Sequence, residues 1–427
     1  MSSLSVNYDD KVCVVGLGYI GLPTACLLAS KGFSVHGVDI NQKAVDFINM
    51  GKAHIVEPDL DLLLKAAVNS GRLKAYLKPE KADVFILAVP TPFKEDHKPD
   101  LSYVEAAVDS IIPYLHEGNL VLLESTSPVG TTEMITQRIL EKRKDLAVAG
   151  HDNQSKSNLF VAYCPERVLP GSILKELINN DRTVGGVDEK STQKAQEFYK
   201  KFVVGQVLPT NSRTAELVKL SENAFRDVNI AFANELSRVC RSLNIDVWEL
   251  IALSNRHPRV KILRPGPGVG GHCIAVDPWF IIDSAPNETQ VMLASRKVND
   301  SQPEYSFKQI SEHFAELELS KRPIALLGLA FKPNIDDLRE SPAVEVVKLV
   351  ANGFKGKIMV VEPHVDHLPK DLSHLPTVQL VGYEQAVSEA GLVVVLVKHS
   401  VFETLKNDQQ RSVKVIDFVG LLSRYES

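Results

Sequence analysis

One cysteine ends a run of glycines and prolines, in the segment RPGPGVGGHCIAVDPWF. Gly266, Gly268, Gly270 and Gly271 precede Cys273. Such a loop cannot form a regular helix, and its backbone amides can approach a ligand closely. A thiolate in such a loop can attack a carbonyl carbon and hold the substrate as a covalent adduct. The segment therefore predicts a mobile loop that carries a nucleophile.

Asp277 follows Cys273 by four residues, so its carboxylate can share the same pocket. A turn carboxylate in front of Pro278 is the alternative interpretation. The remaining cysteines lie in apolar strand or helix patterns and are predicted to be buried thiols without a catalytic role. They are Cys13, Cys26, Cys164 and Cys240.

A second pattern lies near the amino terminus, where VCVVGLGYIG places glycines 16, 18 and 21 between an apolar strand and a helix. Gly16 permits a tight turn, Gly18 lets the backbone approach a pyrophosphate, and Gly21 lets the helix contact the strand. The following strand, VHGVDI, ends in Asp39, whose carboxylate can accept hydrogen bonds from the adenine ribose. Because Asp39 would repel a 2′-phosphate, the pattern favours NAD over NADP. A glycine-rich turn that binds no dinucleotide is the alternative.

Lys219 and Asn223 lie four residues apart in a stretch from about 212 to 243 that contains no Gly or Pro. Apolar residues recur there every three or four positions, which predicts one long helix with both side chains on one face. A solvated helix face would explain the pair equally well in isolation. An NAD enzyme with a pocket thiol, however, needs a cation or amide to stabilise an oxyanion. Together these residues favour hydride transfer combined with capture of an aldehyde.

Alternating apolar runs and helical patterns fill both ends of the chain. The order predicts an α/β protein with two Rossmann-like, doubly wound parallel-sheet domains joined by a long central helix and a helical domain. We expect three domains: 1–205 with the glycine turn for NAD, 206–302 with the long helix and the cysteine loop, and 303–427 with the second sheet. The polar stretch 151–158 is expected to be a surface loop.

The composition narrows the classes of partner. Among the 427 residues, 44% are hydrophobic and 24% charged, and the formal net charge is -5. This is typical of a folded globular protein, and it provides no excess positive charge for nucleic acid or an anionic membrane. No apolar run is long enough to span a bilayer, and the amino terminus carries no leader pattern. Five cysteines without a CxxC pair fit a reducing cytoplasm. No metal site is predicted.

Seven stretches in order resemble the nucleotide-sugar 6-dehydrogenases of the UDP-glucose/GDP-mannose dehydrogenase family, and within it the enzymes acting on UDP-N-acetylmannosamine and UDP-N-acetylglucosamine. They are VGLGYIGLPTA, VPTPFK, ESTSPVGTT, YCPERVLPG, TAELVKLSENAFRDVNIAFANE, NRHPRVKILRPGPGVGGHCIAVDPWF and GLAFKPNIDDLRESPA. The resemblance covers Cys13 to about His399. It implies two hydride transfers to two NAD molecules. It also implies that 303–427 binds the UDP-sugar and that 206–302 mediates assembly as a homodimer or higher homo-oligomer.

The resemblance also implies roles for single residues. Cys273 would trap the C6 aldehyde as a thiohemiacetal, later a thioester, while Lys219 and Asn223 stabilise the oxyanions. Asp277 would orient water and Lys219, and Glu166 would organise water or act as an acid or base. Which residue takes the first alcohol proton stays open. The cofactor would contact Gly16, Gly18, Tyr19, Ile20, Gly21, Asp39, Pro90, Thr91, Thr126 and Arg339, with Thr126 also lining the catalytic pocket.

The UDP-sugar would be bound by a further set of residues. Arg256, His257 and Arg259 resemble the family's phosphate and substrate loop, although each could instead be a surface charge. The full expected set is Glu166, Arg167, Val168, Lys219, Asn223, Arg256, His257, Arg259, Gly266, Gly270 and Lys332.

His272 and the DPW sequence after it differ from the phrase of enzymes that act on UDP-glucose, and so favour an N-acetylated sugar. The manno or gluco configuration at C2 stays open. Three rival functions are a UDP-glucose 6-dehydrogenase, a β-hydroxyacid dehydrogenase that needs no thiol, and a sensor that binds NAD and UDP-sugar without turnover. The combination of Cys273, Lys219, Asn223 and Asp277 argues against the sensor.

Overall fold

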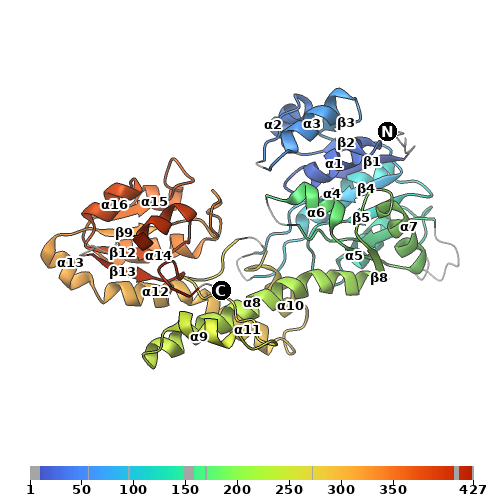
Figure 1. The fold of residues 1–427 in the computed structure, drawn as a ribbon. Coiled ribbons are helices and arrows are strands. Elements are labelled where there is room, and N and C mark those ends of the chain that lie inside the picture. The colour runs from blue at the N-terminus through green and yellow to red at the C-terminus, as the bar shows by residue number, and fades with distance from the viewer. Residues whose placement is uncertain are drawn as a thin grey trace. The chain divides into compact units, whose positions relative to one another are not determined.

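The computed structural model describes residues 10–55, 57–94, 97–148, 158–168, 171–271, 273–407 and 413–425. The chain forms two compact units (Figure 1). One consists of Met1–Glu222 with Trp279–Ser284, and the other of Asn223–Pro278 with Ala285–Ser427. The polar stretch 151–157 and His272 lie outside the described residues.

The first unit is built on an eight-stranded sheet in the order β3-β2-β1-β4-β5-β6-β7-β8. All neighbouring strands are parallel except β6 and β7, which pair antiparallel. The inner strands are almost entirely apolar and buried, as expected for a sheet covered on both faces. The strands are β1 Lys11–Val15, β2 Ser34–Val38, β3 Leu73–Tyr76, β4 Val84–Leu87, β5 Leu120–Leu123, β6 Phe160–Tyr163, β7 Arg182–Gly186 and β8 Val207–Asn211.

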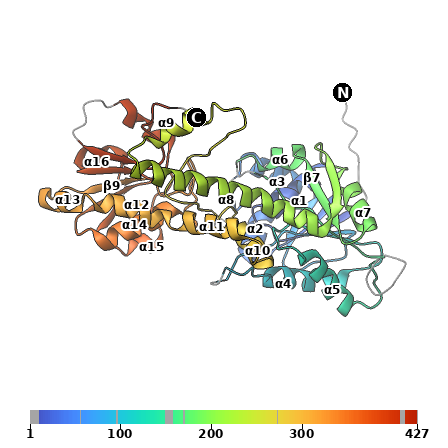
Figure 2. The ribbon, with the colours of Figure 1, turned by 90° about the horizontal axis from the view of Figure 1, so that it is seen from below.

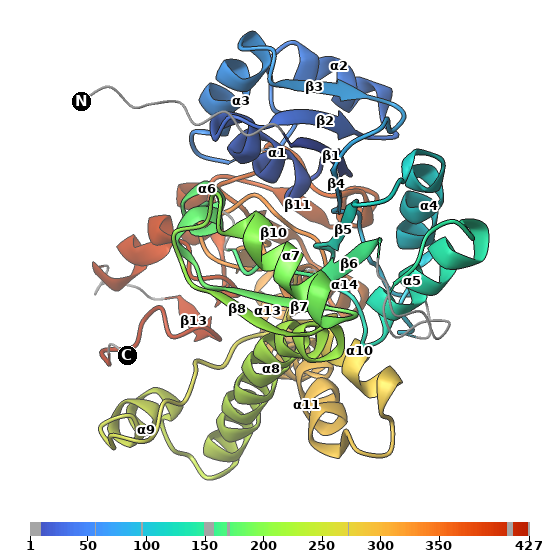
Figure 3. The same cartoon turned by 90° about the vertical axis from the view of Figure 1, so that its right-hand side faces the viewer.

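Helices cover both faces of this sheet (Figure 3). The side chains of α1, α2, α3, α6 and α7 form one apolar core with the sheet, and those of α4 and α5 form a second core on the opposite face. The helices are α1 Gly21–Ser30, α2 Gln42–Asn49, α3 Leu60–Asn69, α4 Ser102–Ile111, α5 Thr131–Lys142, α6 Ile173–Asn179 and α7 Glu189–Tyr199.

The second unit contains a five-stranded, wholly parallel sheet in the order β11-β10-β9-β12-β13. Helices α12 to α15 pack on one face, whereas α16 and the 3₁₀ segment η2 pack on the other (Figure 2). The strands are β9 Ile324–Leu327, β10 Ile358–Val361, β11 Val378–Leu380, β12 Leu392–Val395 and β13 Lys414–Asp417. The helices are α12 Gln302–Ser311, α13 Phe314–Ser320, α14 Pro342–Gly353, α15 Lys370–Ser373, α16 Tyr383–Glu389 and η2 Ser400–Asn407.

The long helix predicted from about 212 to 243 is α8, Ser212–Ser242. In the described part of the chain, α8 is followed, before α12, by α9 Val247–Ser254, α10 Asp277–Ser284 and α11 Gln290–Asp300. Helix α4 ends at Ile111, and the 3₁₀ turn Ile112–Tyr114 follows it; this turn contains Pro113, which lacks a backbone donor.

The predicted fold class is confirmed: the chain contains two doubly wound α/β sheets with a helical segment between them in sequence, and one antiparallel pair is the exception to parallel order. Among the described residues, no helix combines the length and apolarity needed to cross a membrane.

Candidate functional site

The glycine-rich turn between β1 and α1 requires two of its glycines for steric reasons. Gly16 has φ of +92°, and a Cβ there would lie 2.5 Å from the carbonyl oxygen of Ala88. A Cβ on Gly21 would lie 1.8 Å from the carbonyl oxygen of Gly16. Gly18 differs, since no described atom lies within 4 Å of a Cβ placed there. The turn is therefore closed against the strand and open above Gly18, where a pyrophosphate can approach the amino-terminal end of α1.

Asp39 lies directly after β2 and is half-buried. Its Oδ2 accepts the backbone amide of Leu17 at 3.0 Å, and its Oδ1 accepts that of Asn41 at 2.9 Å. These bonds fix the carboxylate beside the glycine turn, where it can still accept from ribose hydroxyls. Tyr19 is exposed and Ile20 half-buried at the start of α1. The residues of this turn fit an NAD molecule.

Two loops that follow β4 and β5 meet at Thr91 and Thr126. The hydroxyl of Thr91 donates to the carbonyl oxygen of Thr126 at 2.5 Å, and Ser125 donates to the carbonyl oxygen of Val89 at 2.7 Å. Pro90 is exposed beside them. Because both loops follow the carboxyl ends of adjacent parallel strands, they lie at the edge where open α/β sheets bind ligands.

Glu216 anchors the loop that carries Thr126, and sequence reasoning missed this role. It lies on α8 and is fully buried. Its carboxylate accepts the amides of Gly130 at 2.7 Å and Thr132 at 2.8 Å, and the hydroxyl of Thr132 at 2.6 Å. Because α5 has no side-chain cap of its own, Glu216 satisfies the donors at its amino terminus. Lys219 is half-buried one turn further along α8.

Glu166 lies in a buried polar cluster. Its carboxylate forms an ion pair with Arg182, and both side chains are almost fully enclosed. The hydroxyl of Tyr199 donates to Glu124 at 2.7 Å in the same cluster. Burial, and then the charge of Glu166, raise the pKa of Glu124 to about 8. One buried carboxylate is therefore charge-paired while its neighbour keeps a proton at neutral pH, an arrangement that the local sequence patterns do not reveal.

Arg167 and Val168 follow Glu166. The guanidinium of Arg167 donates to Glu222 at 2.8 Å and also bonds the carbonyl oxygen of Asp181. Val168 is partly buried against the core of the first unit. Arg167 is thus fixed by two acceptors at the end of β6.

Cys273, Asp277 and Asn223 are connected within the second unit. The amide of Asp277 donates to the carbonyl oxygen of Cys273 at 2.9 Å, which closes the turn that begins α10. The side-chain amide of Asn223 donates to Oδ2 of Asp277 at 2.5 Å. Asp277 is 3% exposed, whereas Cys273 is the exposed one among the five cysteines, all of which are described residues. The structure thus connects three of the residues expected to do the chemistry.

The four other cysteines are buried, as the sequence predicted. Burial raises the pKa of Cys13, Cys26 and Cys164 to about 12 and also raises that of Cys240. These thiols are held in the protonated, unreactive form.

The glycine loop before Cys273 packs against the segment that follows β9. A Cβ on Gly270 would lie 2.5 Å from the carbonyl oxygen of Glu340, and one on Gly271, where φ is +82°, would lie 3.0 Å from the ring of Phe331. The backbone amide of Gly266 is bonded to Oδ1 of Asn234 on α8 at 2.9 Å. Small residues are therefore required here by close packing as well as by conformation.

The remaining basic residues differ in their surroundings. Arg256, His257 and Arg259 are exposed in the segment after α9. Lys332 is half-buried with its ammonium 5.8 Å from the ring centre of Phe331. Arg339 forms a bidentate pair with Asp337 at 2.8 and 2.6 Å. Arg339 belongs to the second unit, as does Lys332.

One aromatic contact also escaped sequence analysis. His97, with φ of +60°, stacks on Trp279 at 4.1 Å between ring centres and 5° between planes. The contact joins the loop after β4 to α10, two residues beyond Asp277. No local pattern marks it, because the partners are far apart in sequence.

A glycine turn fitted to NAD, a second α/β unit and an exposed cysteine on a glycine loop define an NAD-dependent dehydrogenase with a separate substrate domain. Family models extend this conclusion along the chain. The NAD binding domain of the UDP-glucose/GDP-mannose dehydrogenase family matches residues 10–203, its central domain 213–301, and its UDP binding domain 325–424.

Individual proteins are similar over nearly their whole length. An NDP-N-acetyl-D-galactosaminuronic acid dehydrogenase from Ralstonia solanacearum is 53% identical, with 96% of each chain covered. A UDP-N-acetyl-D-mannosamine dehydrogenase from Campylobacter jejuni is also 53% identical, over 97% of this chain and 100% of the other. The structure of a UDP-D-ManNAc dehydrogenase from Pyrococcus horikoshii matches with a TM-score of 0.84 and 37% identity, covering 97% of this chain and 96% of that one.

The chain belongs to the UDP-glucose/GDP-mannose dehydrogenase family. It is an NAD-dependent nucleotide-sugar dehydrogenase. The predictions of NAD as cofactor and of an oxidoreductase are confirmed, and the rival functions as a β-hydroxyacid dehydrogenase or a non-catalytic sensor are set aside.

Proposed function

We propose that the protein oxidises C6 of a UDP-N-acetylhexosamine from alcohol to carboxylate through a covalent adduct on Cys273. The observation that carries the proposal is the exposed thiol on a glycine loop, tied through Asp277 to Asn223 of α8. A hydride-transfer enzyme without a nucleophile would stop at the aldehyde, whereas a thiol permits the second oxidation.

In the proposed reaction NAD, when bound, accepts a hydride in each of the two oxidations. Loss of the alcohol proton and a hydride gives the aldehyde, and the sulfur of Cys273 adds to C6 to form a thiohemiacetal. Loss of the second hydride from C6 and of the hydroxyl proton leaves a thioester. Water then attacks C6 and the carbon–sulfur bond breaks; one proton of the water goes to the thiol, the other to solvent, and the carboxylate is released.

Each remaining residue has a defined part in this proposal. Lys219 and Asn223 supply a positive charge and an amide donor for the oxygen on C6 when it becomes negative. Asp277, held by Asn223, orients water and Lys219. We assign Thr126 and Glu166 to the same reaction, with Glu166 organising water while Arg182 balances its charge. Arg167 and Val168 line the substrate side.

For the substrate we propose that Lys332, Gly266 and Gly270 contact the sugar nucleotide and that Arg256, His257 and Arg259 bind its diphosphate. The exposure of these three basic residues supports this, since an open guanidinium can form a bidentate contact with phosphate. For NAD we propose contacts from Tyr19, Ile20, Pro90, Thr91 and Arg339 in addition to the glycine turn and Asp39.

The N-acetylated sugar is supported by the names of the relatives, which act on UDP-N-acetyl-D-mannosamine or are called N-acetyl-D-galactosaminuronic acid dehydrogenases. We therefore place UDP-ManNAc first, and UDP-GlcNAc and UDP-glucose are the alternatives. The product would be an N-acetylhexosaminuronic acid nucleotide for a surface polysaccharide such as O-antigen or capsule, made in the cytoplasm.

We also propose a homodimer, or a higher homo-oligomer built from it, formed by the central part of a chain organised as 1–205, 206–302 and 303–427. Phe225, Phe232 and Val239 recur every seven residues on α8 and are 72%, 54% and 45% exposed. A heptad-spaced apolar stripe on a long helix is suited to pairing with a second copy. Sedimentation analysis of Phe225→Glu with Phe232→Glu should give monomers, and an unchanged dimer would contradict this interface.

The catalytic proposal is tested with purified protein, NAD and a panel of UDP-ManNAc, UDP-GlcNAc, UDP-GalNAc and UDP-glucose. The expected result is about two NADH for each sugar oxidised, because both oxidations use NAD. With Cys273→Ser, acid formation should fall at least about a thousandfold. Full acid formation by this variant would rule out the thioester route.

A further inference from the structure

Both α/β units place an acidic side chain after the second strand of the sheet, but the two carboxylates are used differently. In the first unit Asp39 is half-buried and binds two backbone amides. In the second unit the corresponding residue is Glu362, which follows β10 and is 4% exposed. The turns that they face are alike, since Gly328 has φ of +97° and donates to the carbonyl oxygen of Val361 at 2.8 Å, as Gly16 donates to Val38.

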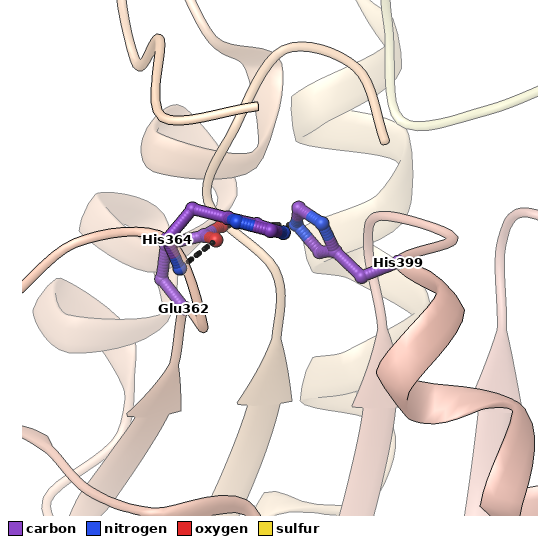
Figure 4. Close-up of side chains that lie close together, drawn as sticks. All are labelled: Glu362, His364 and His399. Atoms are coloured by element: carbon purple, nitrogen blue, oxygen red, sulfur yellow. Dashed lines mark hydrogen bonds and ion pairs between the residues drawn. The ribbon is translucent and has the colours of Figure 1, made fainter. Parts of the chain in front are cut away.

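Glu362 is surrounded by donors. Its Oε2 accepts the amides of Leu329 at 2.7 Å and Ala330 at 3.0 Å, and lies 3.1 Å from Nε2 of His399. Its Oε1 accepts the amide of His364 at 3.1 Å (Figure 4). Unlike Asp39, this carboxylate is enclosed and saturated, so it is not offered to a ribose.

His399 holds the other end of the same segment. Its Nδ1 accepts the backbone amide of Asn334 at 3.0 Å, so Nε2 carries the ring hydrogen and donates to Glu362. Asn334 and Ser400 form a reciprocal pair, with bonds of 2.9 and 3.0 Å. His399 is fully buried. The Glu362–His399 pair therefore binds both ends of Leu329–Asn334.

A metal ion would be the other use of this cluster, because ligand atoms of Glu362, His364 and His399 lie within 4.8 Å of one another. Both ring nitrogens of His399 and both oxygens of Glu362 are already engaged in hydrogen bonds. A cation would have to displace the donors that hold the segment. The hydrogen-bonded arrangement is therefore the better account of these residues.

The segment held in this way carries two residues of consequence. Lys332 lies within it, as does Phe331, whose ring would lie 3.0 Å from a Cβ on Gly271, two residues before Cys273. We infer that Glu362 and His399 are positioning residues for the UDP-sugar, acting by fixing the segment Leu329–Asn334 that presents Lys332 and supports the cysteine loop. This inference rests on the proposed function, because Lys332 is assigned to the sugar nucleotide there.

The first test measures the segment itself in the full-length protein. Hydrogen–deuterium exchange is compared for wild type, His399→Ala, His399→Gln and the control His364→Ala. Among the described residues, His364 bonds Glu362 through its backbone amide, and its exposed ring packs 5.0 Å from the ring of His399 with no hydrogen bond to the segment. His364→Ala should therefore change exchange much less than His399→Ala, which should speed exchange of peptides covering 329–334. His399→Gln, which keeps a donor and an acceptor, should restore part of the protection. Equal protection of 329–334 from exchange in wild type and His399→Ala would refute the positioning role.

The second test measures UDP binding by calorimetry, which does not require turnover. Because His399→Ala loses these buried hydrogen bonds, its affinity for UDP should be at least about fivefold weaker than that of wild type, with NAD binding unchanged. Any substrate that is turned over should show a raised KM with a smaller change in kcat. A merely structural residue would lower the melting temperature and the active fraction without moving these constants.

A double variant links the effect to Lys332. If His399 acts through Leu329–Asn334, His399→Ala should reduce the affinity for UDP much less in a Lys332→Ala background than in wild type. Fully additive losses would contradict this route. Wild-type protein that bound no UDP would overturn the proposed function together with this inference, whereas normal UDP binding by His399→Ala would overturn only the positioning role.

Discussion

The side-chain amide of Asn223 donates to Oδ2 of Asp277 at 2.5 Å, across 54 residues of sequence. This bond ties α8 to the first residue of α10, and the amide of Asp277 in turn bonds the carbonyl oxygen of Cys273. An amide on the long helix therefore helps to orient a nearly buried carboxylate four residues from the nucleophile.

Replacing Asn223 with Asp should disturb the contact with Asp277 more than a shortened side chain at residue 223 would. Two carboxylates in contact cannot both be charged, so one must hold a proton. We expect kcat to fall at least about a hundredfold at neutral pH, with relative recovery at lower pH. The measurement is a pH profile of NADH formation. Asn229→Asp is the control, since Asn229 lies on the same helix and bonds only the carbonyl oxygen of Phe225 among the described contacts; an equal loss in that variant would argue against the prediction.

Cys273 should be the thiol that reacts first with iodoacetamide. It is exposed, whereas the other four cysteines are buried and three have a pKa of about 12. Peptide mass spectrometry should find one rapid modification, at residue 273, that rises in step with loss of NADH formation. Rapid labelling of Cys13, Cys26 or Cys164 in the folded protein would contradict the assignment.

Glu216 should contribute to stability through the donors at the start of α5. Glu216→Ala leaves three donors without their carboxylate, and the expected loss in unfolding free energy is about 2–3 kcal/mol. Because these donors anchor the loop of Thr126, NADH formation should fall as well. The matched control is Glu133→Ala on α5, which removes an exposed ion pair with Arg213 and should change stability by at most about 0.5 kcal/mol. Urea unfolding of both variants makes the comparison, and similar losses would disprove the capping role.

The raised pKa of Glu124 predicts how the stability of the fold depends on pH. Its folded pKa of about 8 lies above the value of an unfolded glutamate, about 4.3. The native state therefore binds an extra proton between these values, and stability falls as pH rises through this range. Glu124→Gln removes the titration, so its melting temperature should fall less than that of wild type between pH ~5 and ~8. The exposed Glu117→Gln should follow wild type. Parallel curves for wild type and Glu124→Gln would show that Glu124 is ionised when folded.

The sequence alone determined the features that depend on short spacing. The order GxGxxG, strand and Asp39 gave the NAD turn, because its steric requirements fall on consecutive residues. The periodicity of 212–243 gave α8, and the glycines before Cys273 gave an irregular loop. These predictions succeed because hydrogen bonding within a helix or a turn involves neighbours along the chain.

Only the tertiary structure decided which polar groups are enclosed together. Glu166 forms an ion pair with Arg182. Glu216 caps α5 by accepting the amide of Thr132, from which it is 84 residues distant in sequence. Glu362 bonds His399, which lies 37 residues further along the chain. Asp39 and Glu362 both follow apolar strands in the sequence. Asp39 is nevertheless half-buried, whereas Glu362 is enclosed and accepts hydrogen bonds on both carboxylate oxygens. The reason is that burial and hydrogen-bond partners come from segments brought together by sheet order, and no local pattern records that proximity.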